Sequence, residues 1–224
     1  MKDLLPRDFN CRFDHAALKS SLDQSDIVTA CWEAGECNLY AVAVNPTWVA
    51  FATRFLQKSQ VKVCSVVGFP LGASRTDVKL MEAAKAAGDG AVEIDMVANI
   101  GWLASGEFSR AEAEIRKIRD GLPYNVLLKV IIEAPELTEK QQQDATRAVI
   151  NSGAQFVKTG TGFYGPATVD QVRTLHQTAD GRIQVKAAGG IKTLSQCREL
   201  LQAGADRLGS SSSVRIVEEW KSQL

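Results

Sequence analysis

Long apolar runs and an excess of charge of either sign are what this sequence lacks. No apolar stretch approaches the roughly 20 residues that a membrane-spanning helix requires, so we expect no membrane partner. The 26 lysines and arginines match the 26 aspartates and glutamates, which leaves a formal net charge of zero. Because no overall positive field exists to attract a polyanion, we also expect no nucleic-acid partner.

Disulfide and metal-binding patterns are missing as well. The five cysteines are odd in number and include no C-x-x-C pair, which predicts free thiols, a reducing compartment and hence a cytoplasmic protein. The two histidines, His15 and His176, form no ligand cluster with them, so we predict neither a metal nor a cofactor. We expect His176 to be solvated on a polar helix face. For His15, a positioning role and simple packing are both open.

What the chain does contain is an alternation of short apolar runs with stretches of helical periodicity. Capping boxes mark three helix starts, at Thr138, Thr168 and Thr193, each followed three residues later by glutamine. This alternation, without a linker or a change in composition, predicts a single (β/α)8 TIM barrel over residues 1–224. A doubly wound open sheet is the alternative, disfavoured because no run resembles an edge strand. The predicted strands are Cys11–Asp14, Leu39–Val44, Val61–Val67, Ala91–Val97, Val126–Ile132, Gln155–Lys158, Ile183–Lys186 and Ala205–Leu208.

Two of these runs end in a lysine that leads into a glycine-rich turn. They are the runs that carry Lys158 and Lys186. An inward-facing ammonium group is costly to bury and is normally neutralised or paired. If the two lysines lie side by side, each lowers the pKa of the other, and the result is an amine that can attack a carbonyl carbon. Two solvated lysines at strand ends are the alternative.

Alternation along the strands sorts the remaining charged residues. Glu93 and Asp95 share the face of the fourth run that points into the barrel, and Asp14 ends the first run. Lys129 lies inside an otherwise apolar run and needs a partner, for which Glu93 or Asp95 is the candidate. A structural ion pair and a direct chemical role are both open for Lys129. The carboxyl ends of barrel strands are where barrel enzymes hold their active sites.

Glycine and serine dominate the loops after the last three runs. These loops are Gly160–Gly162, Gly189–Gly190 and Gly209–Ser212. Exposed backbone N–H groups, serine hydroxyls and the starts of the following helices would together hold a phosphate without strong basic charge. Ordinary loop composition is the alternative, but three such loops adjacent in barrel order favour a phosphate site.

At these residues the sequence resembles the deoxyribose-phosphate aldolase family, over nearly the whole chain. The resemblance implies a class I aldolase, which cleaves 2-deoxy-D-ribose 5-phosphate reversibly to D-glyceraldehyde 3-phosphate and acetaldehyde. By this likeness Lys158 forms a Schiff base with the sugar, Lys186 lowers the pKa of Lys158, and Asp95 transfers protons. The matching blocks are Phe13–His15, Val67–Ala73, Glu93–Val97, Leu128–Glu133, Val157–Phe163, Val185–Ile191 and Gly204–Arg207.

The resemblance also assigns the supporting residues. Asp14 and Lys129 match polar positions of the family's site, and the substrate is a small phosphosugar. The protonated imine is itself the electron sink, so the chemistry needs no metal. The positions that match the family's phosphate-holding residues are Gly162, Gly189, Gly190, Ser211 and Ser212.

Four positions depart from the family pattern and bear on substrate affinity and preference. Ala43 stands where the family usually has cysteine, and Ala16 stands where it usually has threonine. Lys192 replaces a common arginine, and Ser213 replaces a frequent glycine. The two lysines and the aspartate that the chemistry needs are unchanged.

Two other functions are open at this point. A different lysine-dependent aldolase or transaldolase would share the barrel and the imine but act on a phosphorylated ketose. A non-catalytic phosphosugar-binding barrel would bind the ligand without an imine, although such a protein has no reason to keep two inward lysines. A homo-oligomer is also open, since Trp102 and Trp220 could belong to an interface or to the core.

Overall fold

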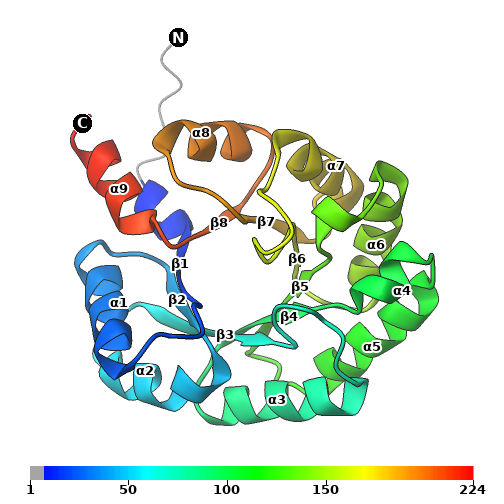
Figure 1. Cartoon of the computed structure of the whole chain (residues 1–224), viewed down its shortest axis with the longest axis horizontal. Coiled ribbons are helices and arrows are strands. Elements are labelled where there is room, and N and C mark those ends of the chain that lie inside the picture. Colours follow the sequence, from blue (N-terminus) through cyan, green and yellow to red (C-terminus); the bar gives the residue numbers. More distant parts are fainter. Residues whose placement is uncertain (1–7, 224) are drawn as a thin grey trace.

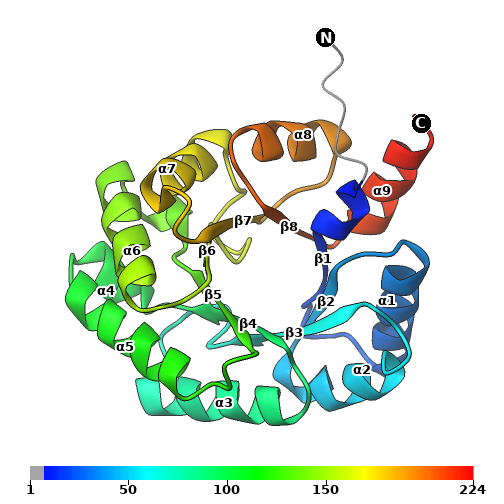
Figure 2. The same cartoon turned by 180° about the vertical axis from the view of Figure 1, so that it is seen from behind.

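The strands form a closed ring. In the computed structural model, which describes residues 8–223, parallel strands follow one another from β1 to β8, and β8 pairs with β1. Figures 1 and 2 show this ring enclosed by the helices. The predicted (β/α)8 barrel is confirmed, and the open sheet is wrong because β1 and β8 are neighbours. The strands are β1 Phe13–Ala17, β2 Ala41–Val44, β3 Lys62–Val67, β4 Glu93–Val97, β5 Leu127–Ile131, β6 Phe156–Lys158, β7 Gln184–Ala188 and β8 Arg207–Ser210.

Helices connect the strands on the outside of the barrel. Between β4 and β5 the described chain forms two helices where the sequence predicted one, because Asn99 caps the additional short helix α4. A 3-10 turn, η1 (Phe9–Arg12), takes up part of the first predicted strand, so β1 begins later than expected. The helices are α1 Gln24–Glu36, α2 Val49–Phe55, α3 Thr76–Gly88, α4 Ile100–Ala104, α5 Phe108–Asp120, α6 Glu139–Asn151, α7 Val169–Ala179, α8 Leu194–Gln202 and α9 Ser213–Lys221, and the other 3-10 turns are η2 Pro46–Trp48 and η3 Ala134–Glu136.

The helix starts follow the local sequence signals. The predicted capping boxes at Thr138, Thr168 and Thr193 are all present, each with reciprocal hydrogen bonds to its glutamine. A further box at Asp23, closed by Asp26, begins α1 and has the same chemistry with aspartate in place of glutamine. These caps set where each helix starts, and therefore how long each loop above the barrel is.

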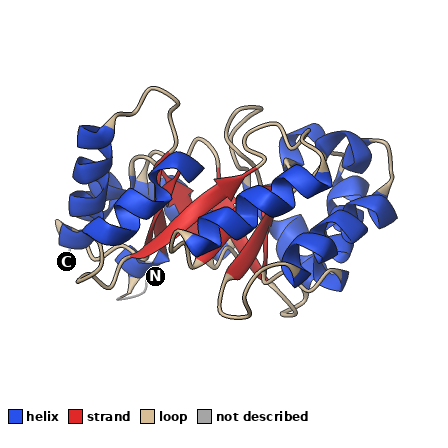
Figure 3. Ribbon diagram, turned by 90° about the horizontal axis from the view of Figure 1, so that it is seen from below, coloured by secondary structure: helices blue, strands red, loops and turns tan. Residues whose placement is uncertain are grey.

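The outward and inward faces of the strands have different compositions. Outward residues such as Ile94, Val130 and Val185 are fully buried and join one apolar cluster beneath the helices. Inside the barrel the corresponding apolar cluster is small and consists of Ala41, Ala43 and Cys64. Buried charged side chains occupy much of the remaining interior: Asp14, Glu93, Asp95, Lys129, Lys158 and Lys186. Figure 3 shows the strands running obliquely between the helices, with loops at both ends of the barrel.

Aromatic packing joins η1, the start of β1 and α9. Phe9 of η1 contacts Phe13 and Trp220 edge to face, with ring centroids 5.1 and 5.3 Å apart. Trp220 is therefore a core residue of α9, whereas Trp102 lies under the guanidinium group of Arg110 at 4.1 Å. Within residues 8–223, no helix is both long and apolar enough to cross a lipid bilayer.

Candidate active site

Lys158 and Lys186 lie side by side inside the barrel. They are paired in register on the adjacent strands β6 and β7, and both are almost completely buried. Their Nζ atoms donate to the same acceptor, the Oδ2 of Asp95 on β4, at 2.6 and 2.7 Å. The two lysines and this aspartate therefore face one another inside the barrel.

The surroundings push the pKa values of the two lysines in opposite directions. Burial lowers the pKa of Lys158 and outweighs the attraction of Asp95, while the neighbouring Lys186 lowers it further. Burial also acts on Lys186, but the carboxylates of Asp14 and Asp95 together outweigh it, so the pKa of Lys186 is raised. The repulsion between the two lysines, the only effect considered from the sequence, does not set the net pKa of Lys186, because the carboxylates raise it. Its second partner, Asp14, makes the difference.

Lys129 is the hub of a buried ion-pair network. Its Nζ lies 2.6 Å from Glu93 Oε2 and 2.8 Å from Asp95 Oδ1, and 3.6 Å from Asp14 Oδ2. Burial opposes its charge, but Asp95 and the other acidic neighbours raise the pKa of Lys129 well above its ordinary value. Lys129 is thus an ammonium ion that fills the barrel interior, which agrees with the structural role considered from the sequence.

Arg207 completes this network, although sequence reasoning did not single it out. Its guanidinium group donates to Asp14 Oδ1 at 2.7 Å and stacks 3.5 Å from the ring centre of Tyr40. Asp14 consequently contacts Lys186 through Oδ2 and Arg207 through Oδ1. These cations outweigh the effect of burial and hold the pKa of Asp14 well below its ordinary value.

A charge count explains which amine can be neutral. The buried network contains three carboxyl groups and four basic groups, so its charges balance only when one basic group is uncharged. An unbalanced charge in such a dry site is strongly unfavourable. Among the four basic groups, Lys158 is the one whose pKa is lowered, and within residues 8–223 its carboxylate partner is Asp95. Of the four basic groups, Lys158 is therefore the one whose surroundings most favour the uncharged form.

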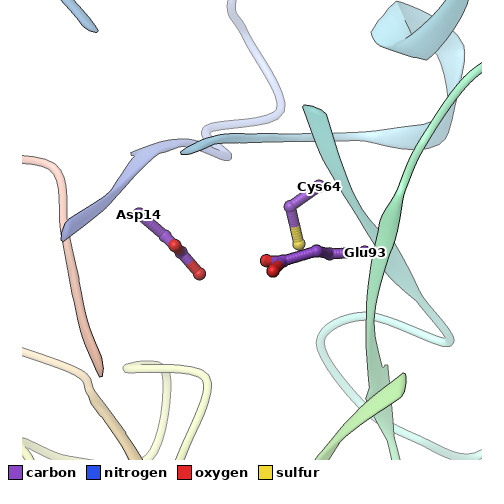
Figure 4. A group of neighbouring side chains, drawn as sticks. All are labelled: Asp14, Cys64 and Glu93. Atoms are coloured by element: carbon purple, nitrogen blue, oxygen red, sulfur yellow. The ribbon is translucent and has the colours of Figure 1, made fainter. Parts of the chain in front are cut away.

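Three potential metal ligands converge near this network. The donor atoms of Asp14, Cys64 and Glu93 lie within 4.8 Å of one another. Figure 4 shows the three side chains pointing into the same part of the barrel. The Nζ of Lys129 already contacts this group, at 3.3 Å from Cys64 Sγ and 2.6 Å from Glu93 Oε2. Burial raises the pKa of Cys64 to about 12, and a protonated thiol is a poor metal ligand. These donors fit an ammonium ion better than a metal.

A cavity of about 620 Å³ opens above the lysines at the carboxyl ends of the strands. Its lining includes Lys158, Lys186 and Asp14, together with most of the predicted phosphate-holding residues: Gly162, Gly189, Gly190 and Ser211. Ser212 is absent from that lining, and its N–H donates to Ser210 Oγ at 2.9 Å. Asp95 and Lys129 lie below the cavity in the barrel interior, fully buried.

Glycine is required where two of these loops touch. A Cβ atom on Gly189 would lie 3.0 Å from the carbonyl oxygen of Gly165 and 3.3 Å from the Cα of Gly162. Gly162 and Gly189 also have φ angles of 88° and 113°, which side chains disfavour. The two loops therefore bring their backbones together at the cavity wall, and this is the close approach that a phosphate cradle needs.

Of the four departures from the family pattern, Ala16, Ala43 and Lys192 line this cavity directly. Ser213 lies just behind it, fully buried at the start of α9, and its hydroxyl is 2.7 Å from the Nδ1 of His15. His176 is exposed, as predicted.

Sequence reasoning also missed Glu133, which lies directly beneath the loop after β6. Glu133 is fully buried, has a left-handed φ of 51°, and accepts the Thr161 N–H with its two oxygens at 3.2 and 3.0 Å. The quoted block Leu128–Glu133 contains it, but nothing in the sequence indicates that its chain turns back toward β6.

A TIM barrel with a lysine-lined cavity at the carboxyl ends of its strands defines a barrel enzyme. A family model described as DeoC/LacD family aldolase matches residues 10–212, and the chain belongs to this family. A deoxyribose-phosphate aldolase from Deinococcus radiodurans is 45% identical over 205 residues, 91% of this chain and 93% of that protein.

Solved structures agree with this family assignment. An aldolase named QR15 superposes with a TM-score of 0.92 at 39% identity, covering 100% of this chain and 98% of its own. A tetrameric deoxyribose phosphate aldolase from Aeropyrum pernix superposes with a TM-score of 0.90 at 31% identity, covering 97% and 92% of the two chains. The chain is therefore similar to aldolases over its full barrel.

Proposed function

We propose that this chain is a class I aldolase that cleaves 2-deoxy-D-ribose 5-phosphate reversibly to D-glyceraldehyde 3-phosphate and acetaldehyde, with Lys158 as the Schiff-base residue. One observation carries the proposal. Lys158 and Lys186 share Asp95 Oδ2, yet burial lowers the pKa of Lys158 while Asp14 and Asp95 keep Lys186 charged. A neutral amine at the floor of a cavity is the nucleophile that imine chemistry requires.

The first half of the reaction joins sugar to enzyme. The neutral Nζ of Lys158 attacks the C1 aldehyde of the open-chain sugar and forms a carbinolamine. Loss of water, with the uptake of one proton, gives the protonated imine. Asp95 lies 2.6 Å from the reacting nitrogen, so its negative charge stabilises the positive imine as it forms.

The second half breaks the C2–C3 bond. Asp95, acting directly or through water, takes the proton of the C3 hydroxyl group, and the bonding electrons move into the imine to give a neutral enamine. Glyceraldehyde 3-phosphate leaves with carbons C3 to C5. The enamine then takes a proton at C2, and hydrolysis releases acetaldehyde and restores the neutral Lys158. The aldol direction uses the same groups in reverse.

The loops at the cavity wall suit the phosphate end of this substrate. Gly162, Gly189, Gly190 and Ser211 line the cavity and offer backbone N–H groups without a strong positive charge. In this proposal Ser212 lies next to Ser211 in the loop after β8 and helps to hold that loop in place. Lys129 positions Asp95, and Asp14 positions Lys186.

Borohydride trapping tests the assignment. The protein is mixed with deoxyribose 5-phosphate, reduced with borohydride and digested, and mass spectrometry locates the modified residue. We expect the adduct on Lys158 and none in Lys158→Leu. An adduct on Lys186 would overturn the choice of nucleophile. If no adduct forms at all, the chain is a binding barrel without imine chemistry.

The donor specificity separates the proposal from the ketose alternative. In the aldol direction with glyceraldehyde 3-phosphate, we expect acetaldehyde to be consumed. Consumption of dihydroxyacetone or its phosphate instead would favour an aldolase or transaldolase that acts on a phosphorylated ketose.

Assembly and location belong to the same proposal. The tetrameric relative from Aeropyrum pernix supports a homo-oligomer, which sedimentation of the purified protein tests. The five cysteines are free, as predicted, and all but Cys11 are buried. Free thiols support a reducing, cytoplasmic environment, which a tagged chain followed by microscopy or cell fractionation checks.

A further inference from the structure

His15 of β1 lies between α1 and α9. Its Nδ1 is 2.7 Å from Ser213 Oγ at the first residue of α9, and its Nε2 is 3.7 Å from Glu33 Oε2 on α1. His15 is 6% exposed and lines the edge of the cavity, whereas Ser213 is fully buried and does not line it. This contact joins residues 198 positions apart, so it connects the start of the barrel to its last loop.

The direction of this hydrogen bond follows from the state of the ring. Burial lowers the pKa of His15 to about 4, so the imidazole is neutral at pH 7. Since Nε2 faces a carboxylate, the ring hydrogen is best placed on Nε2, and Nδ1 then accepts from the Ser213 hydroxyl. The His15 ring and the Ser213 hydroxyl thus form a hydrogen bond in which both groups are neutral.

Hydrogen bonds also hold the segment at the end of β8 that leads into Ser213. Ser210 Oγ donates to the carbonyl oxygen of Ile191 at 2.6 Å, and the Ser212 N–H donates to Ser210 Oγ at 2.9 Å. Ile191 directly follows the glycine pair at the cavity wall. Residues 210–213 are therefore held between the loop after β7 on one side and His15 on the other.

We infer that His15 and Ser213 are positioning residues that set the preference of this enzyme for phosphorylated over unphosphorylated sugars. Their hydrogen bond fixes the loop after β8, whose Ser211 lines the cavity, while Lys158 lies on β6, with β7 between the two strands. Loss of the hydrogen bond between Ser213 and His15 weakens phosphate binding and leaves the amine of Lys158 in place. The inference rests on the proposed function, because it assigns part of that same site.

Comparison of two substrates tests this role. In Ser213→Ala, we expect the KM for deoxyribose 5-phosphate to rise about fivefold to tenfold, the loss expected for one neutral hydrogen bond. The kcat for this substrate, and the kcat/KM for 2-deoxyribose without phosphate, are expected to stay near those of the parent enzyme. Ser222→Ala is the matched control, since it removes a hydroxyl at the other end of α9 that donates to the Glu219 carbonyl oxygen within its own turn.

A histidine pair adds an independent check. His15→Asn keeps a polar atom near the position of Nδ1, whereas His15→Leu keeps only bulk. We expect His15→Leu to repeat the KM effect of Ser213→Ala and His15→Asn to restore most of the affinity. An equal loss on both sugars, or an unchanged KM in Ser213→Ala, would overturn the inference.

The failure of this inference is distinguishable from failure of the proposed function. Binding of inorganic phosphate, measured by calorimetry, is expected to weaken in Ser213→Ala and not in Ser222→Ala, whatever reaction the enzyme catalyses. Unchanged phosphate binding overturns the positioning role even if imine trapping succeeds. Absence of trapping in the parent protein overturns the aldolase proposal, while weakened phosphate binding in Ser213→Ala would still uphold the positioning role.

Discussion

Lys158 and Lys186 share a single acceptor atom, the Oδ2 of Asp95, but only Lys186 has a second carboxylate partner in Asp14. This asymmetry indicates which of the two amines carries the positive charge, namely Lys186. Two neighbouring lysines around one carboxylate would compete for it, and the identity of the neutral amine would be undetermined. Asp14 decides the competition, since it holds the charge on Lys186 and thereby disfavours a second charge on Lys158.

The first prediction concerns the pH dependence of Lys186→Leu. In the parent enzyme the lowered pKa of Lys158 makes the neutral amine available below the ordinary lysine value of 10.5. Removing the Lys186 charge removes one cause of this shift and leaves Asp95 free to stabilise a charged Lys158. We expect the rising limb of kcat/KM to move to higher pH, and the rate at pH 7 to fall by about a hundredfold.

The measurement is a pH–rate profile of both proteins, together with the rate of borohydride trapping. Lys85→Leu is the control for lysine removal, because Lys85 is an exposed lysine of α3 that pairs with Asp89 just after the helix. A profile that keeps the parental midpoint while the rate falls would mean that Lys186 acts on a later step and not on the pKa of Lys158.

A second prediction concerns Asp14→Asn and acid stability. The pKa of Asp14 is lowered from 3.8 by Lys186, Lys129 and Arg207 despite its burial. An acid whose pKa is lowered by folding stabilises the fold above its unfolded value, and the stabilisation is lost as the pH falls toward the folded value. Asp14→Asn removes this dependence, so we expect its unfolding free energy to be lower at pH 7 and to decline less steeply below pH 3.8.

Urea unfolding at a series of pH values checks this expectation. Asp170→Asn, which pairs with Arg173 at the surface of α7, is the control. Identical pH dependence in the parent and in Asp14→Asn would contradict the assigned charge state of Asp14.

Much of this arrangement could be predicted from the sequence, and the reason is periodicity. Alternation along a strand fixes which side chains face the barrel interior, so the inward positions of Asp95 and Lys158 followed from their neighbours. The capping boxes at Thr138, Thr168 and Thr193 set helix starts because the hydrogen bonds are local.

What could not be predicted depends on contacts between distant segments. The raised pKa of Lys186 requires Asp14, which lies 172 residues away and reaches it because β8 closes onto β1. The bond from His15 to Ser213 and the turn that brings Glu133 beneath Thr161 are likewise results of closure and of loop path. No local signal specifies either contact.

A third prediction concerns Lys129 and separates its structural role from a chemical one. Lys129→Met would remove the closest cation of Glu93 and one of the cations that contact Asp95. Breaking a buried ion pair on one side costs about 3–5 kcal/mol, and we expect a loss of this size in the unfolding free energy. The double variant Lys129→Met with Glu93→Gln removes a charge of each sign and should recover part of it.

Denaturant unfolding of the two variants gives the comparison. If Lys129 serves structure alone, the imine still forms in the double variant at a rate close to that of the parent enzyme. A stable double variant without imine formation would instead assign Lys129 a part in the chemistry.

The last prediction concerns Glu133 and the loop that follows Lys158. The carboxylate of Glu133 accepts the Thr161 N–H, and a Cβ on Gly160 would lie 2.7 Å from its Oε1. Burial raises the pKa of Glu133, so its charge is not a source of stability, but its acceptor atoms satisfy a half-buried donor. Glu133→Ala leaves that N–H unpaired, at a cost of about 1–3 kcal/mol, and frees the loop that carries Gly162. We expect a lower melting temperature and a higher KM for the phosphorylated sugar.

Glu133→Gln is the control variant. In Glu133→Gln one amide oxygen still accepts the Thr161 N–H and the buried charge is gone, so stability should match or exceed that of the parent protein. A parental KM in Glu133→Ala would show that the loop keeps its shape without this contact.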